Sequence, residues 1–138
     1  MVRSSIAIKE HLIESKKYVI NPKHRCNAAK ADCTQWTVTE NEELGCFKNS
    51  IINNYLCPSQ CYWWVVDKET SERLGKTDVD DAYIAKFVVD NNATWHGYPV
   101  TGKRELDIPD SSILSIWGNS GILKKKYIRN IVKRMGYV

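Results

Sequence analysis

Residues 82–100, AYIAKFVVDNNATWHGYPV, are the stretch from which we interpret the fold. Its first half is rich in β-branched and aromatic residues, which pack well on a pleated sheet. Three polar residues of types that favour turns follow, namely Asp90, Asn91 and Asn92. The chain then returns through an aromatic run to Pro99. This order predicts a β-hairpin, and we expect the rest of the chain to be organised around it.

The segments around the hairpin predict an α+β fold, with a mainly antiparallel sheet and helices packed against it. Residues 62–66, YWWVV, are apolar on both faces, so we expect a central strand. Residues 34–39 alternate like a strand, and residues 47–56 have helical apolar spacing. Residues 5–17 predict an amphipathic N-terminal helix capped by Ser5.

The C-terminal part carries the clearest helical pattern. A short helix is expected to start after Pro109, capped by one of the two residues that follow. A tight connection leads to a second helix over 122–135, where apolar residues recur at helical spacing, and Gly136 is its expected C-cap. Residues 109–136 therefore predict a helix-turn-helix-like unit on the sheet.

The length of 138 residues predicts a single compact domain spanning residues 1–138. No apolar run approaches the roughly 20 residues of a membrane span. The only apolar patch at the N-terminus contains charges, unlike a secretory signal. We therefore expect a cytoplasmic protein without a membrane partner. The common nucleotide-binding and zinc-protease motifs do not occur in the sequence, and we expect no cofactor.

The net charge of +4 is unevenly distributed along the chain. Residues 1–33 carry +4, residues 34–110 carry −6, and residues 111–138 carry +6 without one acidic side chain. Two interpretations stay open. Either the basic ends form one positive face that meets an anionic partner, or opposite charges neutralise one another within the fold.

The second C-terminal helix places its cations on the side opposite its apolar stripe. These cations are Lys125, Lys126, Arg129 and Lys133. Because solvated helix faces usually mix charge signs, this face favours binding to nucleic acid or to an acidic protein surface. Alternatively, the cations are only solvated or stabilise the helix C-terminus. We expect Lys23, Arg25 and Trp95 to contribute to the binding surface.

Two histidines suggest a different function, a metal-independent ribonuclease. His96 lies beside Trp95 on the return strand of the hairpin, and His24 lies in a basic loop with Lys23. One histidine would take the 2′-hydroxyl proton, the other would protonate the leaving oxygen, and the lysine would stabilise the charged phosphorane. Tyr98 could assist. The sequence does not bring the histidines together, and the alternative for His96 is a half-buried ring packed on Trp95.

Five cysteines lie in the first half of the chain: Cys26, Cys33, Cys46, Cys57 and Cys61. Their spacing contains no C-x2-C pair, so we expect buried reduced thiols in place of a zinc site or disulfides, and no metal.

A third function also stays open. The acidic middle of the chain would suit a small inhibitor or immunity-type protein that blocks a nucleic-acid-binding enzyme.

Overall fold

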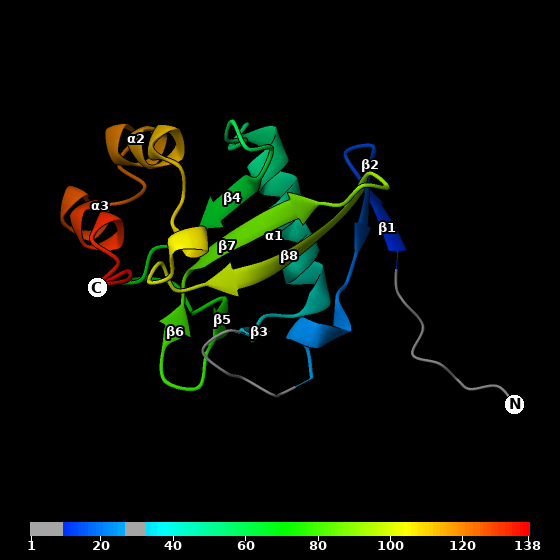
Figure 1. Ribbon diagram of the computed structural model, residues 1–138, viewed down its shortest axis with the longest axis horizontal. Coiled ribbons are helices and arrows are strands. Elements are labelled where there is room, and N and C mark those ends of the chain that lie inside the picture. The colour runs from blue at the N-terminus through cyan, green and yellow to red at the C-terminus, as the bar shows by residue number, and fades with distance from the viewer. Residues whose placement is uncertain (1–9, 27–32) are drawn as a thin grey trace, which may run out of the picture.

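The computed structural model describes residues 10–26 and 33–138. These residues form a five-stranded sheet, a three-stranded sheet and three α-helices (Figure 1). The large sheet has the order β1 (Glu10–Ile13), β2 (Lys16–Val19), β8 (Thr94–Val100), β7 (Ile84–Val89) and β4 (Tyr62–Val65). The small sheet consists of β3 (Gln35–Trp36), β5 (Gly75–Lys76) and β6 (Asp81–Ala82). The predicted α+β class with a mainly antiparallel sheet is confirmed.

The predicted hairpin is present as the antiparallel pair β7 and β8. Its register places Val89 opposite Trp95 next to the turn. The carboxylate of Asp90 holds the turn by accepting hydrogen bonds from the backbone N–H groups of Asn92 and Thr94, at 2.8 and 3.0 Å. The hairpin therefore closes through the polar residues that the sequence places between its two arms.

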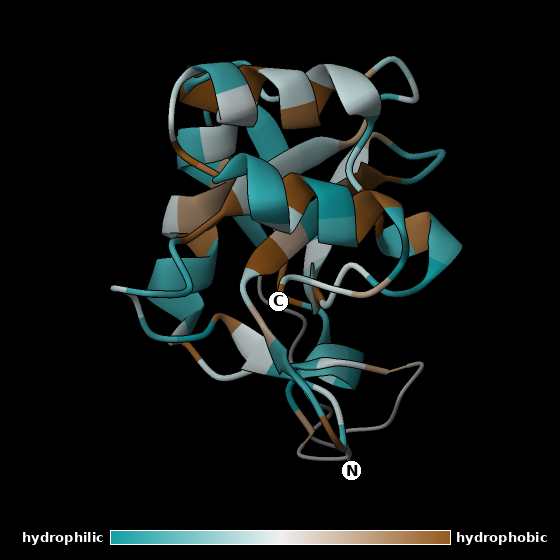
Figure 2. Cartoon of the chain, turned by 90° about the vertical axis from the view of Figure 1, so that its left-hand side faces the viewer, coloured by the Kyte–Doolittle hydropathy of each residue, from teal (hydrophilic) through white to brown (hydrophobic). Residues whose placement is uncertain are grey.

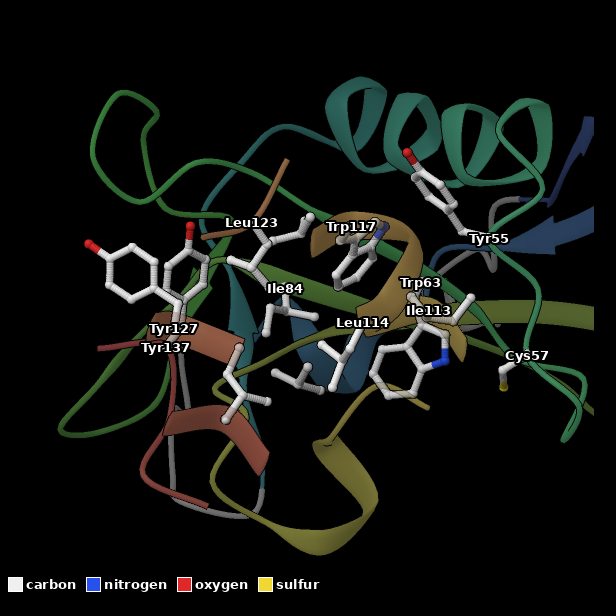
Figure 3. Packing of buried hydrophobic residues seen from close by; sticks show 13 residues of the cluster. Tyr55, Cys57, Trp63, Ile84, Ile113, Leu114, Trp117, Leu123, Tyr127 and Tyr137 are labelled. Atoms are coloured by element: carbon white, nitrogen blue, oxygen red, sulfur yellow. The ribbon is translucent and has the colours of Figure 1, made fainter. Parts of the chain in front are cut away.

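Helices cover both faces of the large sheet. Helix α1 (Glu40–Ile52) packs on one face, and α2 (Ser111–Asn119) and α3 (Lys125–Val132) pack on the other. Figure 3 shows the core on the side of α2 and α3, in which Trp63 of β4 lies in one cluster with Ile113, Leu114 and Trp117 of α2. In Figure 2, hydrophilic stretches alternate with hydrophobic ones along the helices, as expected for elements with one buried side. The predicted C-terminal helical pair is confirmed, with its second helix shorter than 122–135.

The predicted helix over 5–17 is wrong for its described part, because residues 10–17 belong to the hairpin of β1 and β2. Glu14 and Ser15 turn this hairpin with φ angles of 47° and 66°. Neither is glycine or asparagine, the usual residues of such a turn, so the sequence lacks the signal of a hairpin. Residues 5–9 lie outside the described ranges, and the helix of the N-terminal half is α1.

The strand over 62–66 is correct in type but wrong in position, because β4 lies at the edge of the large sheet. Its side chains are still buried on both faces, since α1 covers one face and the C-terminal helices cover the other. The free edge is partly closed by a hydrogen bond from the Trp63 N–H to the Tyr55 carbonyl at 3.1 Å. The burial of β4 on both faces therefore comes from the helices that cover the two faces of the sheet. It does not require a neighbouring strand on each side of β4.

Two other segments differ in extent from the prediction. Within residues 34–39, only the two residues of β3 form a strand. The helix expected over 47–56 begins earlier and ends earlier, as α1. Its start is fixed by a capping box in which Thr39 and Glu42 exchange side-chain to backbone hydrogen bonds, and this signal takes priority over the apolar spacing further on.

The pairing of β2 with β8 is the only parallel pairing between the described strands, and it positions the candidate site. Its register places Tyr18 beside Trp95. Because parallel neighbours run in the same direction, the chain that leaves β2 continues alongside β8. It then enters a single 3₁₀ turn, η1 (Pro22–His24), next to the second half of β8.

Candidate functional site

Alternation along β8 sends its side chains to two different environments. Trp95 belongs to the core under α1, whereas Val100 belongs to the core under α2 and α3. His96 and Tyr98 share the face of Val100 and are only half-buried. They line a pocket of about 290 Å³. The charged and titratable residues around this pocket are Lys23, His24, His96, Tyr98, Arg104 and Asp107.

His24 reaches this pocket from η1 and is 8% exposed. Its Nδ1 lies 2.7 Å from the carbonyl oxygen of Thr34. A carbonyl only accepts, so Nδ1 carries the proton and Nε2 is the free lone pair of the neutral ring. The imidazole stacks on the ring of Tyr98, with centroids 5.2 Å apart and planes 17° apart. Both contacts fix the orientation of the ring.

The position of η1 is set by a cap and by an ion pair. The side chain of Asn21 accepts the Lys23 N–H at 3.0 Å and starts the turn. Just after the turn, the Arg25 guanidinium donates to Glu43 on α1 through Nε and Nη2, at 3.0 and 2.8 Å. The hydroxyl of Tyr18 on β2 donates to the other oxygen of Glu43. Residues from β2, η1 and α1 are thereby joined around one buried carboxylate.

The pKa values of the two histidines are both lowered, chiefly because burial disfavours the charged ring. The charges of Lys23 and of His96 lower the pKa of His24 further, against its hydrogen bond to Thr34. The carboxylate of Asp90 acts in the opposite direction on His96. Burial therefore favours the neutral form of both rings, and Asp90 supports the protonated form of His96.

Tyr98 is held in its neutral, hydrogen-bond-donating form. Burial raises its pKa to about 12, and the nearby carboxylate of Asp107 adds to this effect. The pocket thus holds a neutral phenol, two imidazoles whose pKa values are lowered, and the exposed cations Lys23 and Arg104. Such a set can move protons and hold an anion.

His96 also lines a second hollow, of about 310 Å³. Asn21 belongs to both hollows, and Asp90 and Thr94 from the hairpin turn line only the second. His96 and Asn21 are therefore common to the walls of both hollows. A chain-like ligand can occupy both hollows with one of its links beside the ring.

The structure brings together His24, His96, Tyr98 and Lys23, four of the residues selected from the sequence. Trp95 does not line this pocket. It is buried and packs on Phe47 and Tyr62, with ring centroids 5.5 and 5.2 Å apart. Arg25 does not line the pocket either, and its guanidinium forms an ion pair with Glu43. We therefore assign both residues to the scaffold.

The basic face of α3 lies apart from these residues. Lys125, Lys126, Arg129 and Lys133 are exposed, and none of them forms an ion pair with a residue in the described ranges. The two cations flanking this set are paired: Lys124 with Glu69 at 2.9 Å and Arg134 with Glu105 at 3.7 Å. The second pair connects the end of α3 to the short helix η2 (Glu105–Asp107), which borders the pocket.

Sequence reasoning missed the contribution of Asn21, Thr34, Arg104 and Asp107 to the pocket. Asp107 is buried in η2, and Thr34 is buried just before β3. Each stands in a short irregular segment without periodicity. The local sequence therefore contains no sign that these polar side chains are buried beside the histidines.

All five cysteines are free thiols. Cys46 and Cys57 are buried as expected, and burial raises the pKa of Cys46 to about 12. Cys33 and Cys61 are half-buried, and Cys26 is exposed, so the expectation of burial is wrong for Cys26. Within residues 10–26 and 33–138, no three His, Cys, Asp or Glu side chains form a group suited to hold a metal ion.

Comparisons with protein-family models, with curated proteins and with solved structures give no match. The function must therefore be argued from the geometry of the site. Among the helices in the described part of the chain, none is both long and apolar enough to cross a membrane.

Proposed function

We propose that this protein is a metal-independent ribonuclease whose catalytic pair is His24 and His96. The observation that carries the proposal is the convergence of these two rings, from η1 and β8, on one pocket with Lys23 and Tyr98. Two imidazoles and a lysine around one pocket are the set needed for acid–base cleavage of a phosphodiester. The structural alternative, a half-buried ring packed on Trp95, does not account for the second histidine.

His24 acts as the base in this reaction. The carbonyl of Thr34 holds Nδ1–H, so Nε2 takes the proton from the ribose 2′-hydroxyl. The 2′-oxygen then forms a bond to phosphorus as the bond from phosphorus to the 5′-oxygen breaks. The products are a 2′,3′-cyclic phosphate and a new 5′-hydroxyl end. The lowered pKa of His24 keeps its ring neutral and ready to accept the proton.

His96 acts as the acid and gives its proton to the leaving 5′-oxygen. The carboxylate of Asp90 supports the protonated ring, in opposition to burial. Lys23, exposed at the pocket rim, stabilises the extra negative charge on the phosphorane. The two hollows that His96 lines suit the nucleotides before and after the scissile phosphate.

The test is incubation with single-stranded RNA in the presence of a chelator, followed by mass analysis of the ends. We expect products with 2′,3′-cyclic phosphate and 5′-hydroxyl ends. Matched DNA and 2′-O-methyl RNA are the control substrates, and both should stay intact because neither has a free 2′-hydroxyl. Failure to cut any RNA over long incubation would remove the proposal.

A second candidate function is nucleic-acid binding without cleavage, through α3. It is favoured by the four exposed cations Lys125, Lys126, Arg129 and Lys133, which have no ion-pair partner in the described ranges. Such cations would contact phosphates and give salt-sensitive affinity with little sequence preference. An acidic protein surface is the other partner that this face would accept. No specific observation favours the inhibitor alternative.

A further inference from the structure

Two polar side chains in the pocket are buried without a hydrogen-bond partner in the described ranges. Asp107 is 7% exposed, and its carboxylate accepts no hydrogen bond and forms no ion pair there. Thr34 is also 7% exposed, and its Oγ1 lacks a partner. Neither residue takes part in the proton transfers proposed above. Both nevertheless line the pocket of the two histidines.

The carboxylate oxygens of Asp107 are not sealed from solvent, and Asp107 lines the pocket, so a ligand that displaces water there must replace the hydrogen bonds of that water. Burial raises the pKa of Asp107, whereas the charges of Arg104 and Lys86 lower it and favour the ionised form. A ligand that brings hydrogen-bond donors to Asp107 would supply the missing partners.

We propose that this side of the pocket is a nucleobase subsite that selects guanine, an inference that rests on the proposed ribonuclease function. An ionised carboxylate accepts two N–H groups. Guanine offers two neighbouring donors on its pairing edge, N1–H and the 2-amino group, beside the acceptor O6. The two carboxylate oxygens of Asp107 accept these two donors.

The other three bases match this set less well. Uracil has a single N–H between two carbonyls, so only one oxygen of Asp107 finds a donor. Adenine and cytosine each place a ring nitrogen acceptor next to the amino group, and this acceptor would face the carboxylate. Guanine is therefore the base whose two neighbouring N–H donors complement the two carboxylate oxygens of Asp107.

The size and the apolar side of the pocket are consistent with one nucleotide. The volume of about 290 Å³ is at the small end of ligand pockets, which span roughly 300–1,000 Å³. Leu106 is 69% exposed although it lines the pocket, so its side chain is free to cover the face of a flat ring. With the base at Asp107, the 3′-phosphate of the same nucleotide would lie towards the histidines.

The experiment measures binding of the 3′-monophosphates of guanosine, inosine, adenosine, cytidine and uridine to the intact protein by calorimetry. These nucleotides cannot be cleaved, so binding is read independently of catalysis. We expect the guanosine nucleotide to bind at least about tenfold more tightly than the last three. Inosine lacks the 2-amino group, so its nucleotide should lie between guanosine and the others.

The variant Asp107→Asn should bind the guanosine nucleotide about tenfold more weakly and should no longer distinguish it from the inosine nucleotide. Asp78→Asn, a change to an exposed carboxylate outside the pocket, is the matched control and should keep the preference. The comparison of guanosine with inosine on the wild-type protein keeps the test valid if Asp107→Asn does not fold. Equal affinity for all five nucleotides, or binding of none, would overturn the inference.

The two proposals fail separately. Selective binding of the guanosine nucleotide by a protein that cuts no RNA would refute the ribonuclease and support the subsite. Cleavage after all four bases at similar rates would refute the subsite and leave the ribonuclease intact. Cleavage after guanosine, lost selectively in Asp107→Asn, would support both.

Discussion

The imidazole of His24 stacks on the ring of Tyr98, with centroids 5.2 Å apart. Tyr98 follows His96 by two residues on β8. This contact joins segments that lie far apart in the sequence. It exists because β2 pairs in parallel with β8, so that the chain after β2 runs along β8 and turns at η1. The proposed catalytic pair is therefore a direct product of the sheet topology.

Replacement of either histidine by glutamine should reduce RNA cleavage by about 10²- to 10⁴-fold, the usual contribution of an acid or base. The variants to compare are His24→Gln and His96→Gln, measured as kcat/KM on one RNA substrate. His11→Gln is the matched control, because His11 lies on β1 and does not line the pocket. An equal loss in the control, or full activity of His24→Gln, would count against the assignment.

The pH profile of kcat/KM should be bell-shaped, with its optimum on the acid side of 6.5, the ordinary pKa of histidine. Activity needs His24 neutral and His96 protonated, and the pKa values of both are lowered. The limbs describe the coupled pair, since the charge of one ring acts on the other. An optimum at alkaline pH would contradict this prediction.

The variant Asp90→Asn should move the alkaline limb of that profile to lower pH. The carboxylate of Asp90 raises the pKa of His96, so its loss lets the acid deprotonate earlier. The asparagine oxygen can still accept the turn hydrogen bonds from Asn92 and Thr94. The acid limb should move less, because Asp90 acts on His24 only through the charge of His96. A profile that shifts as a whole would mean that Asp90 does not act on His96 alone.

The chemistry of the site was open to prediction from the sequence, but its assembly was not. The residue types of His24, His96 and Lys23 suffice to suggest acid–base cleavage of RNA. Their meeting depends on the hairpin of β1 and β2, whose turn residues Glu14 and Ser15 carry no turn signal. The parallel pairing of β2 with β8 is long-range and does not affect the local apolar periodicity. The sequence pattern over 5–17 therefore predicted a helix and gave no indication of this pairing.

The rest of the fold follows the same division. The hairpin of β7 and β8 and the C-terminal helices have strong local patterns, and both were predicted correctly. The edge position of β4 was missed, because burial by helices on two faces gives the same apolar sequence as a central strand. Asp107 and Thr34 were missed because a buried polar residue in an irregular segment looks like any loop residue.

The buried ion pair that holds η1 should be important for stability. Glu43→Ala removes the acceptor of the Tyr18 hydroxyl and of the Arg25 Nε and Nη2 groups, and leaves the guanidinium only its bond to the Val38 carbonyl. We expect the free energy of unfolding to fall by about 3 kcal/mol, as when one partner of a buried pair is removed. Urea denaturation measures this change.

The control for that measurement is an exposed ion pair. Arg73 and Asp81 are 2.7 Å apart, with side chains 40% and 50% exposed. Asp81→Ala should lower the free energy of unfolding by at most about 1 kcal/mol. Similar losses in the two variants would mean that Glu43 has no special role in holding η1.

The basic face of α3 should govern the salt dependence of RNA binding. Replacement of Lys125, Lys126, Arg129 and Lys133 by glutamine should weaken binding. It should also make the slope of log affinity against log salt shallower by about 3, since each phosphate contact on a single strand contributes roughly 0.7. Gel shifts at two or more salt concentrations measure both effects, with circular dichroism to verify the fold.

A matched pair elsewhere on the protein calibrates the effect of charge alone. Lys48→Gln with Lys76→Gln removes cations from α1 and β5, away from α3. Per charge removed, this double variant should change the slope much less. An unchanged slope in the α3 variant would show that this face does not contact RNA.

The most direct test of the central claim changes the leaving group of the substrate. A nucleoside 3′-(4-nitrophenyl phosphate) releases nitrophenolate, which leaves without receiving a proton. With this substrate, His96→Gln should recover to within about tenfold of the wild-type rate, whereas His24→Gln should stay at least about 10²-fold slower, because a base is still required. Recovery of neither variant, or equal recovery of both, would contradict the assignment of His24 as the base and His96 as the acid.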